Sequence, residues 1–261
     1  MLQVSVTDIA SHSPDPENIP FSSQLQCFLT DIEGTLTSSL EKVHWECHAE
    51  IASLLGLSKI AQIIRSGDYA EVIEAAPHFI GGPDDKIYEE FLSLAGSNDY
   101  TVTDLLQKKK ELYAALYPKT RIEPRPGVVS ALEFIKSKNI QLFAGSLTRR
   151  ELASKIIKDS GLEKFFPQEN MICREDVEKV GGQLKPDPAV YNLALEKAGI
   201  KPENAIGCED SLNGVKALQN AGVTAIFLPN IHLPVVYHQS PTPYIFTSWE
   251  FLIPILKKLT G

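Results

Sequence analysis

The chain has 261 residues, of which 43% are hydrophobic and 22% are charged, and its formal net charge is −8 at pH 7. This length suffices for one large domain or two modest ones, and the composition is typical of a globular protein. The negative charge argues against a nucleic-acid partner, which requires clustered Lys and Arg, but a small anionic substrate remains compatible with it, because one site can be positive on an acidic surface.

Residues 1–22 are polar and contain prolines, and we interpret them as an N-terminal extension. They lack the basic start and apolar run of a secretory signal, and no segment approaches the roughly 18 consecutive apolar residues of a membrane span. The cysteines contain no C-x-x-C pair, which favours a reducing compartment; they are Cys27, Cys47, Cys173 and Cys208. We therefore expect a cytoplasmic protein that has no membrane partner.

The first predicted strand is the apolar run Leu25–Leu29, which leads into Asp31 and Glu33. After it, the apolar residues recur at helical spacing as far as about residue 120. The spacing predicts helices over Glu41–Leu57, Ile60–Arg65, Tyr69–Ala75, Asp84–Ala95 and Thr103–Leu116. No strand pattern interrupts them, and Gly81-Gly82-Pro83 predicts a loop. We interpret residues 38–120 as a helical domain inserted after the first strand.

From Arg125 onward, helices alternate with short apolar strands. The predicted strands are 140–145, 171–174, 204–208 and 224–228, and the predicted helices are Gly127–Lys138, Arg149–Ser160, Asp187–Ala198 and Leu212–Ala221. A last strand and helix are expected within Tyr244–Leu259. This alternation predicts an α/β core, a Rossmann-like parallel sheet with helices on both faces, formed by residues 23–37 and 121–261.

Polar residues gather where these strands end, at the edge of a parallel sheet where ligands bind. The set comprises Asp31, Ser146, Glu209 and Asp210, with Lys185 in a loop just before a helix. In an extended chain residues i and i+2 face the same side, so Asp31 and Glu33 would lean toward a common point and perturb each other's proton affinity.

Several carboxylates with few His or Cys are suited to Mg²⁺. A lysine and a serine at the same edge could hold the oxygens of a phosphoryl group, and an aspartate could attack phosphorus to form an aspartyl-phosphate. The acid two residues further on could protonate the leaving oxygen and later activate water.

Each feature taken alone also has a simpler interpretation. Asp31 and Glu33 could belong to a turn with an N-capping acid, Ser146 could cap the next helix, and Glu209 with Asp210 could begin a helix. Lys185 could be a solvated surface charge. The occurrence of all four features at one sheet edge favours a phosphoryl-transfer site.

The segments DIEGTLTSS, GSLTRRE, LKPDPAVYNLALEKAG and GCEDSLNGVKALQNAG resemble motifs one to four of the haloacid dehalogenase superfamily. They look most like the branch that contains phosphoglycolate phosphatase and β-phosphoglucomutase. The resemblance covers residues 25–38 and 120–228, and the helical block has the position and length of that branch's α-helical cap.

The resemblance implies a role for each matching residue. Asp31 matches the nucleophile and metal ligand, and Glu33 matches the general acid/base, whose backbone carbonyl also binds metal. Ser146, followed by Leu147, matches the phosphate-binding segment, and Lys185 matches the ammonium that steadies nucleophile and phosphate. Asp210 matches the acidic metal ligand, with Glu209 as a second one, and the implied cofactor is Mg²⁺.

The chain also departs from the pattern of this branch. Glu33 stands where Asp is usual, Ser38 stands at another usual Asp position, and a branch histidine is shifted by one residue to His44. We expect Glu33 to reach a leaving oxygen despite its extra methylene. Substrate contacts are expected from His44, Gly81 and Gly82, although a helix-surface histidine and a simple turn are the alternatives.

The function predicted from these features is Mg²⁺-dependent hydrolysis of a small phosphorylated metabolite through an aspartyl-phosphate, by a monomer or weak homodimer. A β-phosphoglucomutase-like mutase is the alternative that uses the same aspartyl-phosphate but returns the phosphoryl group to a sugar. A dehalogenase or a phosphonate hydrolase fits less well, since the first needs neither Mg²⁺ nor the paired acids and the second needs a cap lysine. A non-catalytic phosphate-binding or partner-binding protein is the alternative from another class.

Overall fold

The computed structural model describes residues 24–37, 39–67, 69–80, 82–96, 99–229 and 242–260. The chain divides into two compact units, whose described parts are the α/β unit, residues 24–37 with 122–229 and 242–260, and the helical unit, residues 39–121. The predicted N-terminal extension, Ser38 and Gly81 lie outside the described residues. None of the helices in the described ranges combines the length and apolar character that crossing a lipid bilayer requires.

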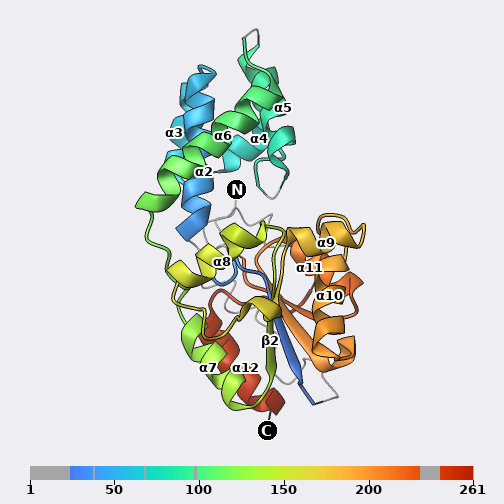
Figure 1. Ribbon diagram of the computed structural model, residues 1–261. Coiled ribbons are helices and arrows are strands. Elements are labelled where there is room, and N and C mark those ends of the chain that lie inside the picture. The colour runs from blue at the N-terminus through green and yellow to red at the C-terminus, as the bar shows by residue number, and fades with distance from the viewer. Residues whose placement is uncertain are drawn as a thin grey trace. The chain divides into compact units, whose positions relative to one another are not determined.

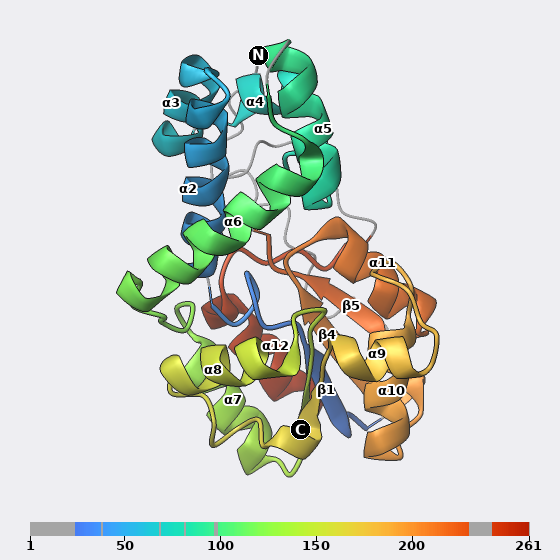
Figure 2. The same cartoon turned by 45° about the horizontal axis from the view of Figure 1, so that its top comes forward.

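The centre of the α/β unit is a five-stranded sheet whose paired strands are all parallel (Figures 1 and 2). Its strands, in the spatial order β3-β2-β1-β4-β5, are β1 (Cys27–Thr30), β2 (Gln141–Gly145), β3 (Met171–Ile172), β4 (Ala205–Glu209) and β5 (Thr224–Phe227). The central strand β1 is completely buried. The predicted Rossmann-like parallel α/β fold is confirmed.

Helices flank this sheet on both faces. They are α7 (Val128–Ser137), α8 (Arg150–Asp159), α9 (Arg174–Lys179), α10 (Ala189–Ala198), α11 (Leu212–Asn220) and α12 (Trp249–Thr260), with short 3₁₀ turns η3 (Gln168–Asn170) and η4 (Pro202–Asn204). Figure 1 shows α7 and α12 side by side on one face and α10 on the other. Successive side chains of β1 point to opposite faces of the sheet, so the strand contacts the helices on both faces. Cys27 and Leu29 join the core cluster formed with α10 and α11, whereas the ring of Phe28 lies 5.8 Å from that of Trp249 on α12.

Three elements of this unit differ from the sequence-based expectation. The strand expected at 171–174 stops at Ile172, because a new helix, α9, begins at Arg174. The backbone N–H of Cys173 donates to Asp176 Oδ2 at 2.9 Å, which caps this short helix. The strand expected after Tyr244 is reduced to a single bridge between Ile245 and Phe227.

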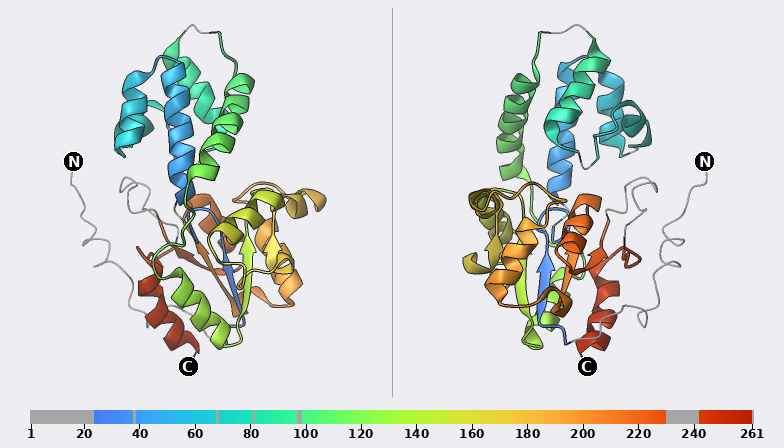
Figure 3. Two further views of the ribbon diagram at one scale, coloured as in Figure 1. Left: turned by 60° about the vertical axis from the view of Figure 1, so that its left-hand side comes forward. Right: turned by 90° about the vertical axis from the view of Figure 1, so that its right-hand side faces the viewer.

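The helical unit contains only helices and turns in its described residues. Its elements are α2 (Ser39–Leu54), α3 (Ser58–Ser66), α4 (Ala70–Ala75), α5 (Asp84–Ala95), α6 (Val102–Leu116) and the 3₁₀ turn η2 (Tyr117–Lys119). Figure 3 shows α2 and α6 running side by side. The unit has its own apolar core, in which Ile51, Tyr88, Phe91 and Leu105 are inaccessible to solvent. This separate core fits a unit that folds around its own hydrophobic centre.

Candidate active site

The parallel register brings the carboxyl ends of three strands together. Thr30 of β1 pairs with Ala144 of β2 on one side and Cys208 of β4 on the other, so Asp31 follows β1 at the level where β4 ends in Glu209. The chain runs from β1 to β2 and β3 and then crosses to β4, which makes the β1–β4 boundary a topological switch point. Ligands of open α/β sheets bind at such points.

Lys185 joins two of the carboxylates at this edge. Its Nζ lies 2.6 Å from Asp31 Oδ1, 2.6 Å from Glu209 Oε1 and 3.1 Å from the carbonyl oxygen of Gly145. The interpretation of Lys185 as a solvated surface charge is therefore wrong, since only 9% of its side chain is exposed. Burial lowers the pKa of Lys185, but attraction to Asp31 and Glu209 outweighs burial, so the pKa is raised and the ammonium stays charged.

Asp31 is a buried carboxylate among other carboxylates. Burial raises its pKa, Lys185 opposes that rise, and the charges of Glu209 and Asp210 add to it, so the pKa lies well above its usual range. One ammonium group therefore does not balance the three acids. A bound divalent cation would supply the missing positive charge.

The donor set fits such a cation. Asp31, Glu209 and Asp210 each offer a carboxylate oxygen, and the three oxygens lie within 4.8 Å of one another. Three hard oxygen donors without His or Cys are the ligands that Mg²⁺ prefers. The described residues therefore provide a site suited to this ion, with the strand ends holding the ligands in place.

Two glycines make room for these acids. Gly34 has φ +84°, and a Cβ there would lie 2.1 Å from Asp210 Oδ2, so the turn after Asp31 requires glycine both for its backbone and for its close contact. Gly214 on α11 leaves space for the carboxylate of Glu209 in the same way, since a Cβ there would lie 1.9 Å from Glu209 Cδ. Thr35 then donates a hydrogen bond to Asp210 Oδ1 at 2.9 Å.

Glu209 is almost inaccessible to solvent, with 1% of its surface exposed. Besides Lys185, the hydroxyl of Tyr191 on α10 donates to Glu209 Oε1 at 2.5 Å, and Ser211 donates to Oε2 at 3.3 Å. Glu209 is the last residue of β4, and it is Ser211 whose side chain caps α11. The simpler interpretation of this segment as a helix start therefore applies to Ser211 only.

Glu33 has a different partner from Asp31. β1 ends at Thr30, so the alternation of an extended chain does not continue through Asp31 to Glu33. Asp31 accepts a hydrogen bond from Lys185, whereas Glu33 Oε1 accepts one from the hydroxyl of Thr148, which lies after β2. The two predicted reactive acids are thus held separately, and the carboxylate of Glu33 is not one of the three clustered metal donors.

Ser146, the first residue after β2, is buried, with 3% of its surface exposed. Its Oγ accepts a hydrogen bond from the N–H of Thr148 at 3.1 Å. The simpler interpretation of Ser146 as a helix cap is wrong, because α8 begins at Arg150 and its N-cap residue is Arg149. The side chain of Leu147 packs against the core cluster of the α10 face.

The substrate residues suggested in the helical unit have local partners there. His44 is half-buried on α2, and its ring lies 4.9 Å from that of Tyr113. The N–H of Gly82 donates to the carbonyl oxygen of His78 at 3.0 Å, and a Cβ on Gly82 would lie 2.3 Å from that oxygen. This geometry favours the alternative that Gly82 serves a tight turn between helices.

Four residues of the site were missed in the sequence: Thr35, Thr148, Tyr191 and Arg125. Thr35 and Thr148 lie inside the segments DIEGT and GSLT, which could have marked them as candidates. Their hydrogen-bond partners, Asp210 and Glu33, are remote in the sequence, so the pairing could not be predicted. Arg125 donates to the carbonyl oxygens of Gly34 and Leu228, both at 2.7 Å, and so supports the turn that follows Asp31.

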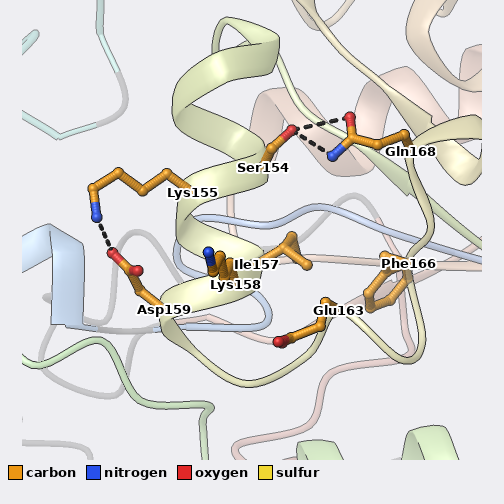
Figure 4. Close-up of a pocket in the computed structure, with 8 residues that line it drawn as sticks. All are labelled: Ser154, Lys155, Ile157, Lys158, Asp159, Glu163, Phe166 and Gln168. Atoms are coloured by element: carbon orange, nitrogen blue, oxygen red, sulfur yellow. Dashed lines mark hydrogen bonds and ion pairs between the residues drawn. The ribbon is translucent and has the colours of Figure 1, made fainter.

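The most voluminous of the hollows described on the α/β unit lies elsewhere. This hollow has a volume of about 550 Å³, and its lining comes from α8 and the segment after it (Figure 4). Ser154 and Gln168 share hydrogen bonds there, and Lys155 pairs with Asp159. It contains none of the strand-end acids, so its size does not identify the reactive site.

Comparisons with known proteins relate the chain to one family of hydrolases. The sequence profile of the haloacid dehalogenase-like hydrolase family matches residues 25–222. The phosphorylated carbohydrates phosphatase of Thermotoga maritima is 29% identical over 206 residues, which cover 78% of this chain and 84% of that protein. Protein CbbY of Cereibacter sphaeroides is 25% identical over 222 residues, covering 80% and 86% respectively.

The crystal structure of CbbY from Rhodobacter sphaeroides in complex with phosphate superposes with a TM-score of 0.61. The two chains are 21% identical, and the match covers 88% of this chain and 96% of that one. This likeness shows the fold.

Proposed function

The chain belongs to the haloacid dehalogenase-like hydrolase family, and from this premise we propose that it is a Mg²⁺-dependent phosphatase that hydrolyses a small phosphorylated carbohydrate through an aspartyl-phosphate. The observation that carries the proposal is the position of Lys185 Nζ, 2.6 Å from Asp31 Oδ1, at the strand ends where the three acids meet. A nucleophilic carboxylate needs cations beside it to approach an anionic phosphate, and this arrangement supplies one.

The metal would be held by Asp31, Asp210 and Glu209, whose oxygens form the donor set described above. When bound, it neutralises negative charge on the nucleophile and on the transferring phosphoryl group. Lys185 adds its fixed positive charge, and the hydroxyl of Ser146 and the backbone of Leu147 are proposed to bind the remaining phosphoryl oxygens.

The first step forms a bond from Asp31 to phosphorus. The bond from phosphorus to the sugar oxygen breaks, its electron pair stays on that oxygen, and protonated Glu33 gives it a proton. In the second step Glu33, now a carboxylate, takes a proton from water as the water oxygen attacks phosphorus. The bond to Asp31 breaks, inorganic phosphate leaves, and both carboxyl groups return to their starting states.

The substrate class comes from the Thermotoga maritima relative, which is named for phosphorylated carbohydrates. We propose that the helical unit acts as a cap that selects the substrate and excludes water, as lids of enzymes do. A β-phosphoglucomutase-like mutase would instead return the phosphoryl group to a sugar, so the release of inorganic phosphate distinguishes the two reactions.

The test measures phosphate release from a panel of sugar phosphates, with phosphoglycolate and p-nitrophenyl phosphate as comparison substrates. Wild type, Asp31→Asn and the control Asp159→Asn are compared with Mg²⁺ and with chelator. Asp159 pairs with Lys155 on the surface of α8, outside the strand-end acids. We expect activity that depends on Mg²⁺, favours a sugar phosphate, falls by at least about 10³-fold in Asp31→Asn and persists in Asp159→Asn. Equal activity in wild type and Asp31→Asn would refute the mechanism.

A further inference from the structure

Two hydrogen bonds of the Thr148 backbone hold this residue in place, independently of its hydroxyl group. Its N–H donates to Ser146 Oγ at 3.1 Å, and its carbonyl oxygen accepts from the N–H of Arg174 at 3.3 Å. The first bond ties it to the end of β2 and the second to the start of α9. The Thr148 hydroxyl therefore starts from a position that rigid elements determine.

That hydroxyl donates to Glu33 Oε1, across 115 residues of sequence. Glutamate has one more rotatable bond than aspartate, so its carboxyl group explores more positions unless a neighbour holds it. A carboxyl group that is held at one oxygen can still carry the transferring proton on the other. The hydrogen bond from Thr148 thus restricts the extra freedom that Glu33 introduces, without blocking proton transfer.

The same residue also contacts the proposed phosphate-binding hydroxyl of Ser146. Glu33, Thr148 and Ser146 consequently form one connected set: carboxylate, hydroxyl with backbone N–H, and hydroxyl. A proton donor is effective only within hydrogen-bond reach of the leaving oxygen. The connected set would keep the distance between the carboxyl group of Glu33 and the bound phosphate constant.

We infer that Thr148 is a positioning residue that sets the carboxyl group of Glu33 relative to the phosphoryl site, an inference that rests on the proposed phosphatase function. Thr148 acts through Glu33 rather than on the substrate. Its removal should therefore matter where the departing oxygen needs a proton and should matter little where the oxygen leaves without one.

The experiment compares kcat/KM for two substrates with Thr148→Val, Thr148→Ser and Glu33→Gln. One substrate is a sugar phosphate, whose alkoxide needs a proton, and the other is 2,4-dinitrophenyl phosphate, whose phenolate leaves unaided. The parameter kcat/KM reports only steps up to the departure of the leaving group, which separates this step from later hydrolysis of the aspartyl-phosphate. Thr148→Ala is a second variant that lacks the hydroxyl.

We expect Thr148→Val and Thr148→Ala to lower kcat/KM for the sugar phosphate by about 10-fold or more and for the dinitrophenyl ester by less than about 3-fold. Thr148→Ser should restore the sugar phosphate reaction. Glu33→Gln combined with Thr148→Val should be no slower than Glu33→Gln alone, because both changes remove the same proton transfer. The matched control is Thr242→Val, a buried threonine whose hydroxyl donates to the carbonyl oxygen of Ala225 at 2.8 Å, and its rates should stay unchanged.

Equal losses on both substrates, or losses of Thr148→Val and Glu33→Gln that multiply in the double variant, would overturn the inference and leave the phosphatase function intact. Absence of Mg²⁺-dependent turnover by the wild type on either ester would instead refute the proposed function, and the inference would fall with it. The two failures are therefore distinguishable.

Discussion

The ammonium group of Lys185 lies 2.6 Å from Oδ1 of Asp31, although 154 positions separate the two residues in the sequence. The same nitrogen lies 2.6 Å from Glu209 Oε1, so one buried cation serves two buried anions. With Asp210 close by, the site holds more negative than positive charge. This imbalance determines how the site should respond to substitution and to metal.

Replacing Lys185 with Met should destabilise the metal-free protein by about 3–5 kcal/mol, because breaking a buried ion pair leaves carboxylates without compensation. Mg²⁺ should then stabilise Lys185→Met more than it stabilises the wild type. Urea unfolding with Mg²⁺ and with chelator measures both effects. The control Lys155→Met removes an exposed pair with Asp159 and should change stability by less than about 1 kcal/mol. An equal Mg²⁺ effect on wild type and Lys185→Met would contradict this account.

Replacing Gly34 with Ala should weaken metal binding through Asp210. The new Cβ would lie 2.1 Å from Asp210 Oδ2 at a residue with φ +84°, so it adds a collision to the backbone strain. Gly199→Ala is the matched control, because Gly199 has φ +66° but a Cβ there meets nothing within 4 Å. Both variants should lose about 1 kcal/mol or more of stability through strain. Only Gly34→Ala should raise the Mg²⁺ concentration for half-maximal activity, by about 10-fold or more.

Two buried tyrosines should respond oppositely to loss of their hydroxyl groups. Tyr191→Phe should lower the free energy of unfolding by about 1.5–3 kcal/mol, because the Tyr191 hydroxyl donates a hydrogen bond to the buried carboxylate of Glu209. Tyr88→Phe should be neutral or stabilising, because the Tyr88 hydroxyl is buried without a hydrogen-bond partner among the described residues. Chemical denaturation of both variants gives the comparison. A similar loss in both would mean that ring packing, rather than the bond to Glu209, explains the role of Tyr191.

His48 in the helical unit should make stability fall in mild acid. Burial, the charge of Lys109 and the charge of His44 hold the pKa of His48 well below its usual value. Asp84 Oδ1 lies 3.8 Å from His48 Nε2, but Lys109 already binds that oxygen at 2.5 Å. Below about pH 6.5 the imidazole of His48 binds a proton in the unfolded chain but stays neutral in the folded protein. The free energy of unfolding therefore decreases as the pH falls, by at most about 1.4 kcal/mol per pH unit.

Unfolding free energies of wild type and His48→Gln at pH 7 and pH 5 test this dependence. The wild type should lose stability relative to His48→Gln as the pH falls, since the variant has no imidazole to protonate. Parallel pH profiles for wild type and His48→Gln would show that His48 is not the responsible group.

Much of the fold followed from local patterns. Both ends of the helix Asp84–Ala95 were predicted, because acidic residues begin it and Gly96 follows it. The strands at 141–145 and 205–209 were predicted to within one residue from short apolar runs between helices. The helix α9 was not predicted, because six residues are too few to show a helical period and its cap depends on one side-chain contact of Asp176.

The sequence by itself determined which residue types stand at the strand ends, since a parallel α/β pattern and the segments around Asp31, Ser146, Lys185 and Asp210 can be recognised without coordinates. Only the tertiary structure decided how they are paired: Lys185 between Asp31 and Glu209, and Glu33 with Thr148. The reason is physical. Motif spacing fixes the order of the strand ends, whereas side-chain partners depend on sheet register, burial and the space that Gly34 and Gly214 leave open.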